Sequence, residues 1–315
     1  MLNKIDQFYA MKASIVPKPT TNIIVVKPDY RLALDLMLQK LTLKKYSPNT
    51  IKTYMHMFKQ FLGYMHPMPL HRVTTAHIMH YHKELVTKHN VSPSYQNQSI
   101  NAIKFYIEKV LELPKVKYDF CRPRKAKTLP KVLSLEEVFS ILDATKNIKH
   151  RTILSVIYGC GLRISECINL KIEDIDSSNM RVWVRNAKGQ KDRITLLSPT
   201  LLEQLRAYYK IFRPKQWLFE GPTEKKYSAS SIRKVFNRSR KKAGVNVPAT
   251  VHSLRHSFAT HLLDSGTNLR YIQKLLGHNS SRTTEIYTHV STTNLMSVES
   301  PFEKIGKINI LAYRK

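Results

Sequence analysis

The chain has 315 residues, enough for two ordinary domains, and 42% of them are hydrophobic, which permits packed cores and argues against global disorder. Its 52 Lys and Arg outnumber its 22 Asp and Glu, and the net charge of +30 predicts a polyanionic partner, with nucleic acid first. Three cysteines without a CxxC pair argue against a disulfide framework and a cysteine zinc site. No apolar run approaches the roughly 20 residues of a membrane span, so we expect a cytoplasmic protein that contacts no membrane.

The N-terminal part of the chain divides into an extension and a helical domain. Residues 1–29 carry three prolines and little helical periodicity, so we expect a loosely packed extension with a short strand at TNIIVV. From Tyr30 the pattern is helical, and IKTYMHMFKQFL repeats apolar residues at spacings of three and four. The preceding SPNT supplies a cap with a proline in the first turn. Because SPSYQNQSINAIKFYIEKVLEL repeats this logic, residues 30–115 are predicted to form a compact domain of about four helices.

A basic stretch separates this domain from the rest of the chain. The sequence CRPRKAKTLPK, residues 121–131, contains two prolines and no acidic residue, which is typical of a linker. Its charge would let it lie along phosphates, and the alternative is a merely solvated linker. The candidate phosphate contacts are Arg122, Arg124, Lys125 and Lys127.

A second domain begins at SLEEVFSILDA, where Ser134 and Glu137 are predicted to form a capping box before an apolar-periodic helix. Near residue 180 the periodicity changes to two, AKGQKD forms a turn and RITLL returns, which predicts a β-hairpin within a mostly helical domain. From Val251 the pattern is helical almost to the end. The basic run before it supplies further candidate DNA contacts: Arg233, Lys234, Arg238, Arg240, Lys241 and Lys242.

The predicted organisation therefore has five parts. They are an extension (1–29), a helical domain (30–115), a basic linker (116–132), a second domain (133–298) and a C-terminal tail (299–315). The tail, which includes SPFEKIGKINIL, is apolar enough to dock on a neighbouring copy, and the alternative is packing on its own domain.

Several polar side chains stand out against the helical background: Arg163, Lys188, His252, Arg255, His256, His278 and Tyr287. Each alone has an ordinary explanation as an ion pair, a solvated charge or a packing residue. Three arrangements could unite them. His252 and His256 are one turn apart with His261 nearby, which resembles half a zinc site, but no HExxH glutamate completes it. A passive DNA-binding protein explains the charge but not this particular set. Phosphoryl transfer to Tyr287 requires every member of the set.

The motifs GCGLRISECINL, AKGQKDR and HSLRHSFATHLLDSGTNLRYIQKLLGHNSSRTTEIYTHV, in this order, resemble the tyrosine recombinase (phage integrase) family, closest to its Xer and integron-integrase branch. SPNTIKTYMHMFKQFL is similar to the family's N-terminal core-binding domain, which is SAM-like. The resemblance implies a mainly α fold with a small β-hairpin or sheet in the catalytic domain, and a two-domain, C-shaped DNA clamp. It implies a catalytic set of Arg163, Lys188, His252, Arg255, His278 and the nucleophile Tyr287.

The chemistry explains the two arginines. Attack on a phosphodiester places charge on the nonbridging oxygens, and Arg163 and Arg255 would stabilise that charge as permanent forked cations. His278 would add a hydrogen bond to the same oxygens.

The remaining residues would move protons. A phenol with a pKa near 10 needs a proton acceptor, for which His252 is the candidate on sequence grounds, while Lys188 would protonate the leaving 5′ oxygen. Lys191 lies in the same turn, and the family's Lys-Gly step favours Lys188. We interpret His256 as structural support.

The resemblance also implies the partners. They are double-stranded DNA with paired recombination sites and three further copies of the chain, as a homotetramer with a dimer on each of two sites. Because the ester energy is kept in a 3′-phosphotyrosyl link, no cofactor and no metal are implied. The outcome is integration, excision, inversion or dimer resolution. The alternatives are a catalytically silent DNA-binding accessory protein and a type IB relaxing topoisomerase.

Overall fold

The computed structural model describes residues 30–113, 122–123, 129–187, 191–222, 225–278 and 280–288. Several expectations fall outside them: the strand at 21–26, the tail, Lys188, and three of the four linker candidates (Arg124, Lys125 and Lys127). The chain divides into two compact units, Met1–Lys127 and Thr128–Lys315. No helix in the described part of the chain is both long and apolar enough to cross a membrane.

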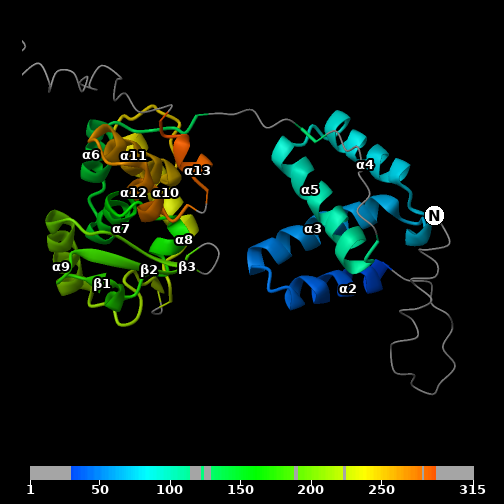
Figure 1. Cartoon of the computed structure of the whole chain (residues 1–315), viewed down its shortest axis with the longest axis horizontal. Helices are drawn as coiled ribbons and strands as arrows, with labels where there is room; N and C mark the ends of the chain where they lie inside the picture. The colour runs from blue at the N-terminus through cyan, green and yellow to red at the C-terminus, as the bar shows by residue number, and fades with distance from the viewer. Residues whose placement is uncertain are drawn as a thin grey trace, which may run out of the picture. The chain divides into compact units, whose positions relative to one another are not determined.

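The described residues of the first unit are helical, as predicted (Figure 1). They form α2 (Tyr30–Leu43), α3 (Pro48–Met65), the 3-10 turn η1 (Leu70–Arg72), α4 (Thr75–Thr87), α5 (Pro93–Phe105) and the π-helical turn η2 (Tyr106–Val110).

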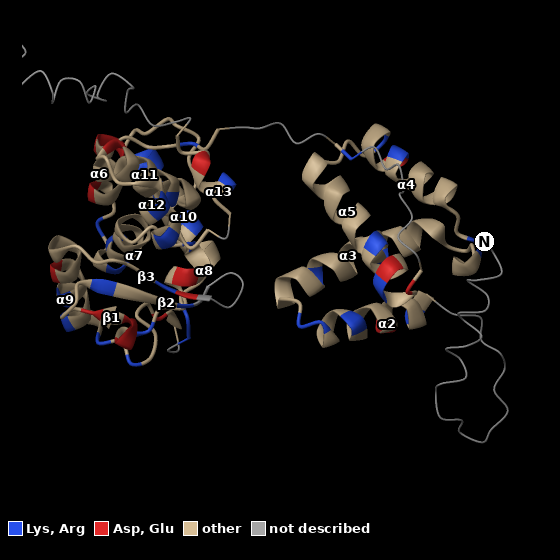
Figure 2. Ribbon diagram, in the orientation of Figure 1, with Lys and Arg blue, Asp and Glu red and all other residues tan. Residues whose placement is uncertain are grey.

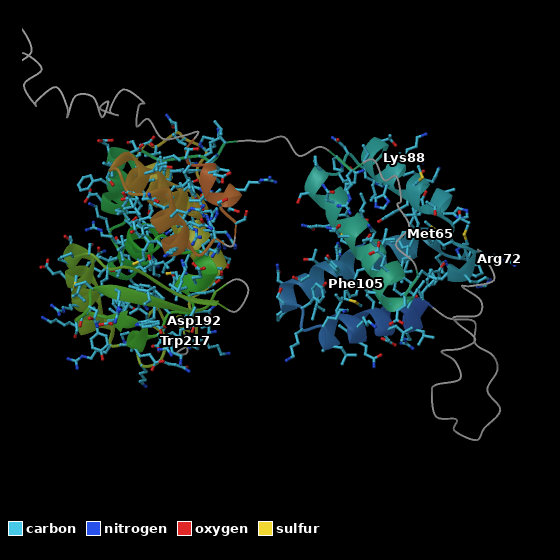
Figure 3. All side chains as sticks on the ribbon, viewed as in Figure 1. Met65, Arg72, Lys88, Phe105, Asp192 and Trp217 are labelled. Atoms are coloured by element: carbon cyan, nitrogen blue, oxygen red, sulfur yellow. The ribbon has the colours of Figure 1, made fainter. Side chains whose placement is uncertain are left out.

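Helix α3 has the cap and the apolar face that the sequence predicted. The Ser47 hydroxyl accepts a hydrogen bond from the Thr50 amide at 3.2 Å, and a proline occupies the first turn. Phe58 is fully buried, and its ring lies 4.4 Å from that of Tyr106 between centroids. Figure 3 labels Met65 at the end of α3 and Phe105 at the end of α5, both of which are buried in this core.

The second unit combines helices with a small sheet that lies along one side of it (Figure 1). Its helices are α6 (Leu135–Ala144), α7 (Ile148–Gly159), α8 (Ile164–Cys167), α9 (Pro199–Phe212), α10 (Ala229–Lys242), α11 (Val251–Asp264), α12 (Leu269–Leu276) and α13 (Arg282–Glu285). The sheet has β1 (Ile175–Asp176), which follows the 3-10 turn η3 (Ile172–Asp174), then β2 (Arg181–Ala187) and β3 (Lys191–Leu196).

The predicted hairpin is confirmed, and a third strand joins it to form a three-stranded sheet. β2 pairs antiparallel with β3 in a register that places Val182 opposite Thr195, and β1 pairs with the other edge of β2. Val182 and Val184 are buried, as period-two patterning requires. Figure 3 shows Asp192 of β3 and Trp217 close to this sheet. β1 has only two residues, too few for any sequence periodicity.

Helices α6 and α7 lead the chain to the candidate site. The predicted capping box is confirmed, since Glu137 accepts from the Ser134 amide at 2.9 Å and Ser134 accepts from the Glu137 amide at 3.2 Å. α7 runs through the core with Leu154, Val156 and Ile157 fully buried. Its C-terminal end is therefore fixed in place by packing around the helix.

Candidate active site

The turn after α7 positions Arg163. Gly161 has φ +60°, which lets the chain reverse, and Leu162 is then buried. Arg163 occupies the position before the first residue of α8, with its side chain half-buried. The Arg163 amide and guanidinium both donate to Glu166, at 2.8 and 2.6 Å. The charged end of Arg163 is thus held by the short helix that it precedes.

We expect Gly161→Ala to destabilise the second unit by roughly 2–4 kcal/mol, because a side chain at positive φ is strained and a Cβ would lie 2.4 Å from Phe258 Cδ1. Gly244→Ala is a matched control, since Gly244 also has a positive φ but no atom within 4 Å of the added carbon. Urea unfolding monitored by tryptophan fluorescence measures both variants. Equal effects would contradict the steric part of this prediction.

Arg255 joins three segments at the site. It lies on α11 and is 1% exposed. Its Nη1 donates to the carbonyl of Gly161 at 2.8 Å, and its Nη2 donates to the carbonyl of Leu276 at 2.6 Å. The Nη2 also donates to His278 Nε2 at 3.1 Å. The guanidinium therefore bonds the turn after α7 to the end of α12.

His278 follows the end of α12, where Gly277 adopts φ +64°. Because its Nε2 accepts from Arg255, its other nitrogen carries the proton and donates to Thr284 Oγ1 at 3.0 Å. Burial, with Arg255 as the strongest of the neighbouring cations, lowers the pKa of His278 to about 3. The ring is neutral at physiological pH, with both nitrogens engaged.

Tyr287 is buried beside these groups. Its side chain follows α13 and is 1% exposed. The Tyr287 hydroxyl lies 3.1 Å from Nδ1 of His256, and its ring is nearly parallel to that of His278, with 6.4 Å between centroids. Burial raises the pKa of Tyr287, whereas Arg255 and Arg163 act in the opposite direction. The phenol is therefore protonated at neutral pH.

A buried carboxylate organises the arginines. Glu166 of α8 accepts hydrogen bonds from Arg163, from Arg193 of β3 at 3.0 Å and from Arg255 at 3.4 Å. Burial opposes ionisation, but the arginines and the Arg163 amide hold the pKa of Glu166 below its ordinary value. Arg193 also donates from Nε to the carbonyl of Leu275 at 2.8 Å. In Figure 2, acidic red marks α8, and basic blue marks α11 and α12.

His252 differs from His256 in its surroundings. It is exposed to solvent, and its ring meets His256 edge-to-face with 4.5 Å between centroids. Desolvation by the neighbouring protein atoms, followed by the positive charges of Arg255 and Arg163, lowers the pKa of His252. His261, the third histidine of the zinc alternative, is hydrogen-bonded to Tyr158 at 2.9 Å. Across the described residues, no three His, Cys, Asp or Glu side chains are grouped as metal ligands.

Two family models match the two parts of the chain. The model of the phage integrase family matches residues 131–294, and that of the phage integrase N-terminal SAM-like domain matches residues 34–115. The chain belongs to the phage integrase family.

Relatives within the family match most of the chain. A putative integrase/recombinase, y4qK, of Sinorhizobium fredii is 37% identical, over 86% of this chain and 88% of the relative. The tyrosine recombinase XerA of Thermococcus kodakarensis is 32% identical, over 85% of this chain and 94% of the relative. Among solved structures, a lambda integrase tetramer bound to a Holliday junction has a TM-score of 0.67 at 17% identity, over 94% of this chain and 87% of that one. The structural match supports the shared fold alone.

The structure of this phage integrase family chain brings together four of the six predicted site residues. Arg255, His278 and Tyr287 are joined by a hydrogen bond and ring stacking, and Arg163 is joined to Arg255 through the shared carboxylate of Glu166. His252 is adjacent through His256. Lys188 lies outside the described residues.

The DNA-contact candidates on α10 divide into two kinds. Arg240 donates from Nη1 to the carbonyls of Val245 and Val247, both at 2.8 Å, so it secures the loop after the helix. The other five basic residues of that run are exposed. In the linker, Arg122 donates to the Asn101 side chain at 3.1 Å.

Sequence reasoning missed Glu166 and Arg193, and it assigned His256 only a supporting role. The R-x-x-E spacing of Arg163 and Glu166 resembles an ordinary helical ion pair. What distinguishes this pair is that Glu166 also accepts from Arg193 and Arg255, which lie far along the chain and which no local pattern indicates.

Proposed function

We propose that this member of the phage integrase family is a site-specific DNA recombinase, which cleaves and rejoins strands through a 3′-phosphotyrosyl link to Tyr287. The observation that supports this function most directly is that Arg163, Arg255 and His278 lie around the buried side chain of Tyr287, the arginines as electrostatic neighbours and His278 by ring stacking. Three arginines share the single carboxylate of Glu166, so the cluster carries an excess of positive charge that packing alone does not require and that a bound phosphate would balance.

The arginines supply electrostatic stabilisation. In-line attack by the phenol oxygen places negative charge on the nonbridging phosphate oxygens, and preorganised cations stabilise that charge without reorganising. Arg163 and Arg255 are held by Glu166 and by backbone carbonyls, so they are oriented before DNA binds. In the free protein Arg255 and Thr284 engage both ring nitrogens of His278, so its expected hydrogen bond to the phosphate oxygens requires that DNA displace one of these partners.

Cleavage conserves the energy of the ester. The Tyr287 oxygen replaces the 5′ oxygen on phosphorus, and Lys188 gives the leaving oxygen its proton. Another strand's 5′ hydroxyl then attacks the phosphotyrosine and restores a phosphodiester. Because the energy of the ester is conserved, no ATP is needed. Because the arginines stabilise the developing charge, no metal ion is needed.

Charge on the helices provides the DNA contacts. Arg233, Lys234, Arg238, Lys241 and Lys242 are exposed on α10, where they can neutralise phosphates. We assign the helical domain, residues 30–115, to core-site binding, residues 116–132 to the linker and residues 133–298 to catalysis.

We propose that the active assembly is a homotetramer on two DNA sites, with a dimer on each. A lambda integrase of similar fold is known as a tetramer bound to a Holliday junction, and that assembly is the precedent for the proposed one. Because DNA is its substrate, we place the protein in the cytoplasm.

The test is adduct formation without metal. Purified protein is incubated with nicked, fragmented host DNA in EDTA or in Mg²⁺, then denatured, and covalently bound DNA is recovered and sequenced. We expect equal adduct in both buffers and a shared core sequence. Tight DNA binding without adduct would favour the catalytically silent DNA-binding protein, and relaxation of a supercoiled plasmid that lacks the site would favour a topoisomerase.

A further inference from the structure

The Tyr287 hydroxyl has one neighbour whose chemistry suits proton transfer. If Tyr287 is the nucleophile, its hydroxyl must lose a proton as the bond to phosphorus forms, because a protonated phenol is a weak nucleophile. Among the described side chains, His256 places a ring nitrogen, Nδ1, 3.1 Å from that hydroxyl.

Of the other groups near the hydroxyl, Arg163, Arg255 and His278 lack a free acceptor, and the described contacts of His252 do not include the hydroxyl. Arg163 and Arg255 are cations with donors only. His278 accepts from Arg255 through Nε2 and donates to Thr284 through Nδ1, so neither nitrogen is open to the phenol. His252 makes its ring contact with His256 and is exposed to solvent.

We infer that His256 accepts the proton of the Tyr287 hydroxyl during strand cleavage and returns it during rejoining, an inference that rests on the proposed recombinase function. In cleavage, the Oη–H bond breaks and Nδ1 of His256 gains the proton as the Oη–P bond forms. The P–O5′ bond breaks, and Lys188 protonates the 5′ oxygen. Rejoining reverses each transfer. His252, exposed beside the site, is then free to donate a hydrogen bond to the phosphate.

The electrostatic setting leaves His256 neutral and able to accept, but it makes the ring a weak base in the free protein. Burial, His252 and Arg255 lower the pKa of His256 to about 4, so the ring is neutral in the free protein and its Nδ1 can accept from the phenol. A bound phosphodiester adds negative charge next to Arg255 and Arg163, which offsets those cations and strengthens His256 as a base. Proton acceptance is therefore favoured when DNA occupies the site.

The chain offers a matched control on the same helix. His261 of α11 makes an equivalent Nδ1 contact with a tyrosine hydroxyl, that of Tyr158, at 2.9 Å. His256→Asn and His261→Asn each keep a hydrogen-bonding group near the Nδ1 position and remove the basic nitrogen. His252→Asn tests the alternative base, and His256→Gln is the second variant should His256→Asn fold poorly.

The experiment measures the rate of adduct formation on a nicked duplex carrying the sequence recovered from the wild-type adduct. We expect His256→Asn to lower this rate about 100-fold and His261→Asn to leave it within about threefold, since a general base contributes 10²–10⁴-fold. Incorporating 3,5-difluorotyrosine at position 287 makes the phenol more acidic and less dependent on a base. The defect of His256→Asn should then shrink to roughly tenfold or less.

Three results would overturn the inference: a His256→Asn rate close to that of wild type, a defect that fluorination leaves unchanged, or a fluorination-rescued defect in His252→Asn instead. Absence of adduct from the wild-type protein is a different failure, because it contradicts the proposed recombinase function itself. Circular dichroism and DNA affinity of each variant distinguish a chemical defect from misfolding.

Discussion

Replacing Tyr287 with phenylalanine should abolish the covalent adduct while DNA binding stays intact. Phenylalanine has no oxygen to attack phosphorus, yet it fills the same buried space between His256 and His278. The loss of one hydrogen bond, which leaves the His256 nitrogen unpaired, should lower the free energy of unfolding by only about 1–3 kcal/mol. The variant should therefore bind the core site and release it uncut.

The measurement is denaturing gel analysis of protein bound to labelled nicked DNA, beside a binding titration. Tyr158→Phe is the matched control, because it also removes a tyrosine hydroxyl bonded to a histidine of α11, from a residue that is half-buried. An adduct that persists in Tyr287→Phe would assign the nucleophile to another residue.

Among the substitutions described, removing the charge of Glu166 should lower the free energy of unfolding most. Its side chain is 5% exposed and lies within 3.4 Å of three guanidinium groups, those of Arg163, Arg193 and Arg255. Breaking a buried ion pair by removing one partner costs about 3–5 kcal/mol, because the remaining charges are left uncompensated. We expect Glu166→Gln to lose stability in this range and to lose cleavage as its arginines move.

Glu173→Gln provides the comparison, since Glu173 also faces two cations, Lys171 and Arg185, but its side chain is 58% exposed. Its loss should change stability by less than about 1 kcal/mol. Both tryptophans, Trp183 and Trp217, lie in the second unit, so fluorescence during urea unfolding reports on that unit. Similar losses in the two variants would contradict the buried-network account.

The Glu166 prediction has a definite pH dependence. Its pKa is lower in the folded protein, so its contribution to stability is complete above the unfolded-state pKa of a glutamate and is lost as pH falls through the folded value. The stability difference between wild type and Glu166→Gln should therefore narrow in acid.

Local features of the fold were predictable from sequence. The caps of α3 and α6 depend on residues three positions apart, and the β2–β3 hairpin on alternation over a few residues. Strand β1 was not predictable, because two residues carry no period and its pairing depends on the position of β2.

The candidate site was predictable only as a set of residue types in order. Nothing local distinguishes His252 from His256, which lie one turn apart on α11. Their surroundings differ because Tyr287, 31 residues beyond His256, packs against one of them. The same limit applies to Glu166, whose partner Arg193 is 27 residues away on a different element.

The bonds of Arg255 to Gly161 and Leu276 have a consequence for how the protein is made. During synthesis the helical first unit leaves the ribosome early, and the turn before α8 follows it. Leu276, whose carbonyl accepts from Arg255, and Tyr287 leave it only near the end. A product interrupted before residue 276 keeps its basic helices but has neither the anchor of Arg255 nor the proposed nucleophile, Tyr287. On the proposed function, such fragments are expected to bind DNA without cleaving it.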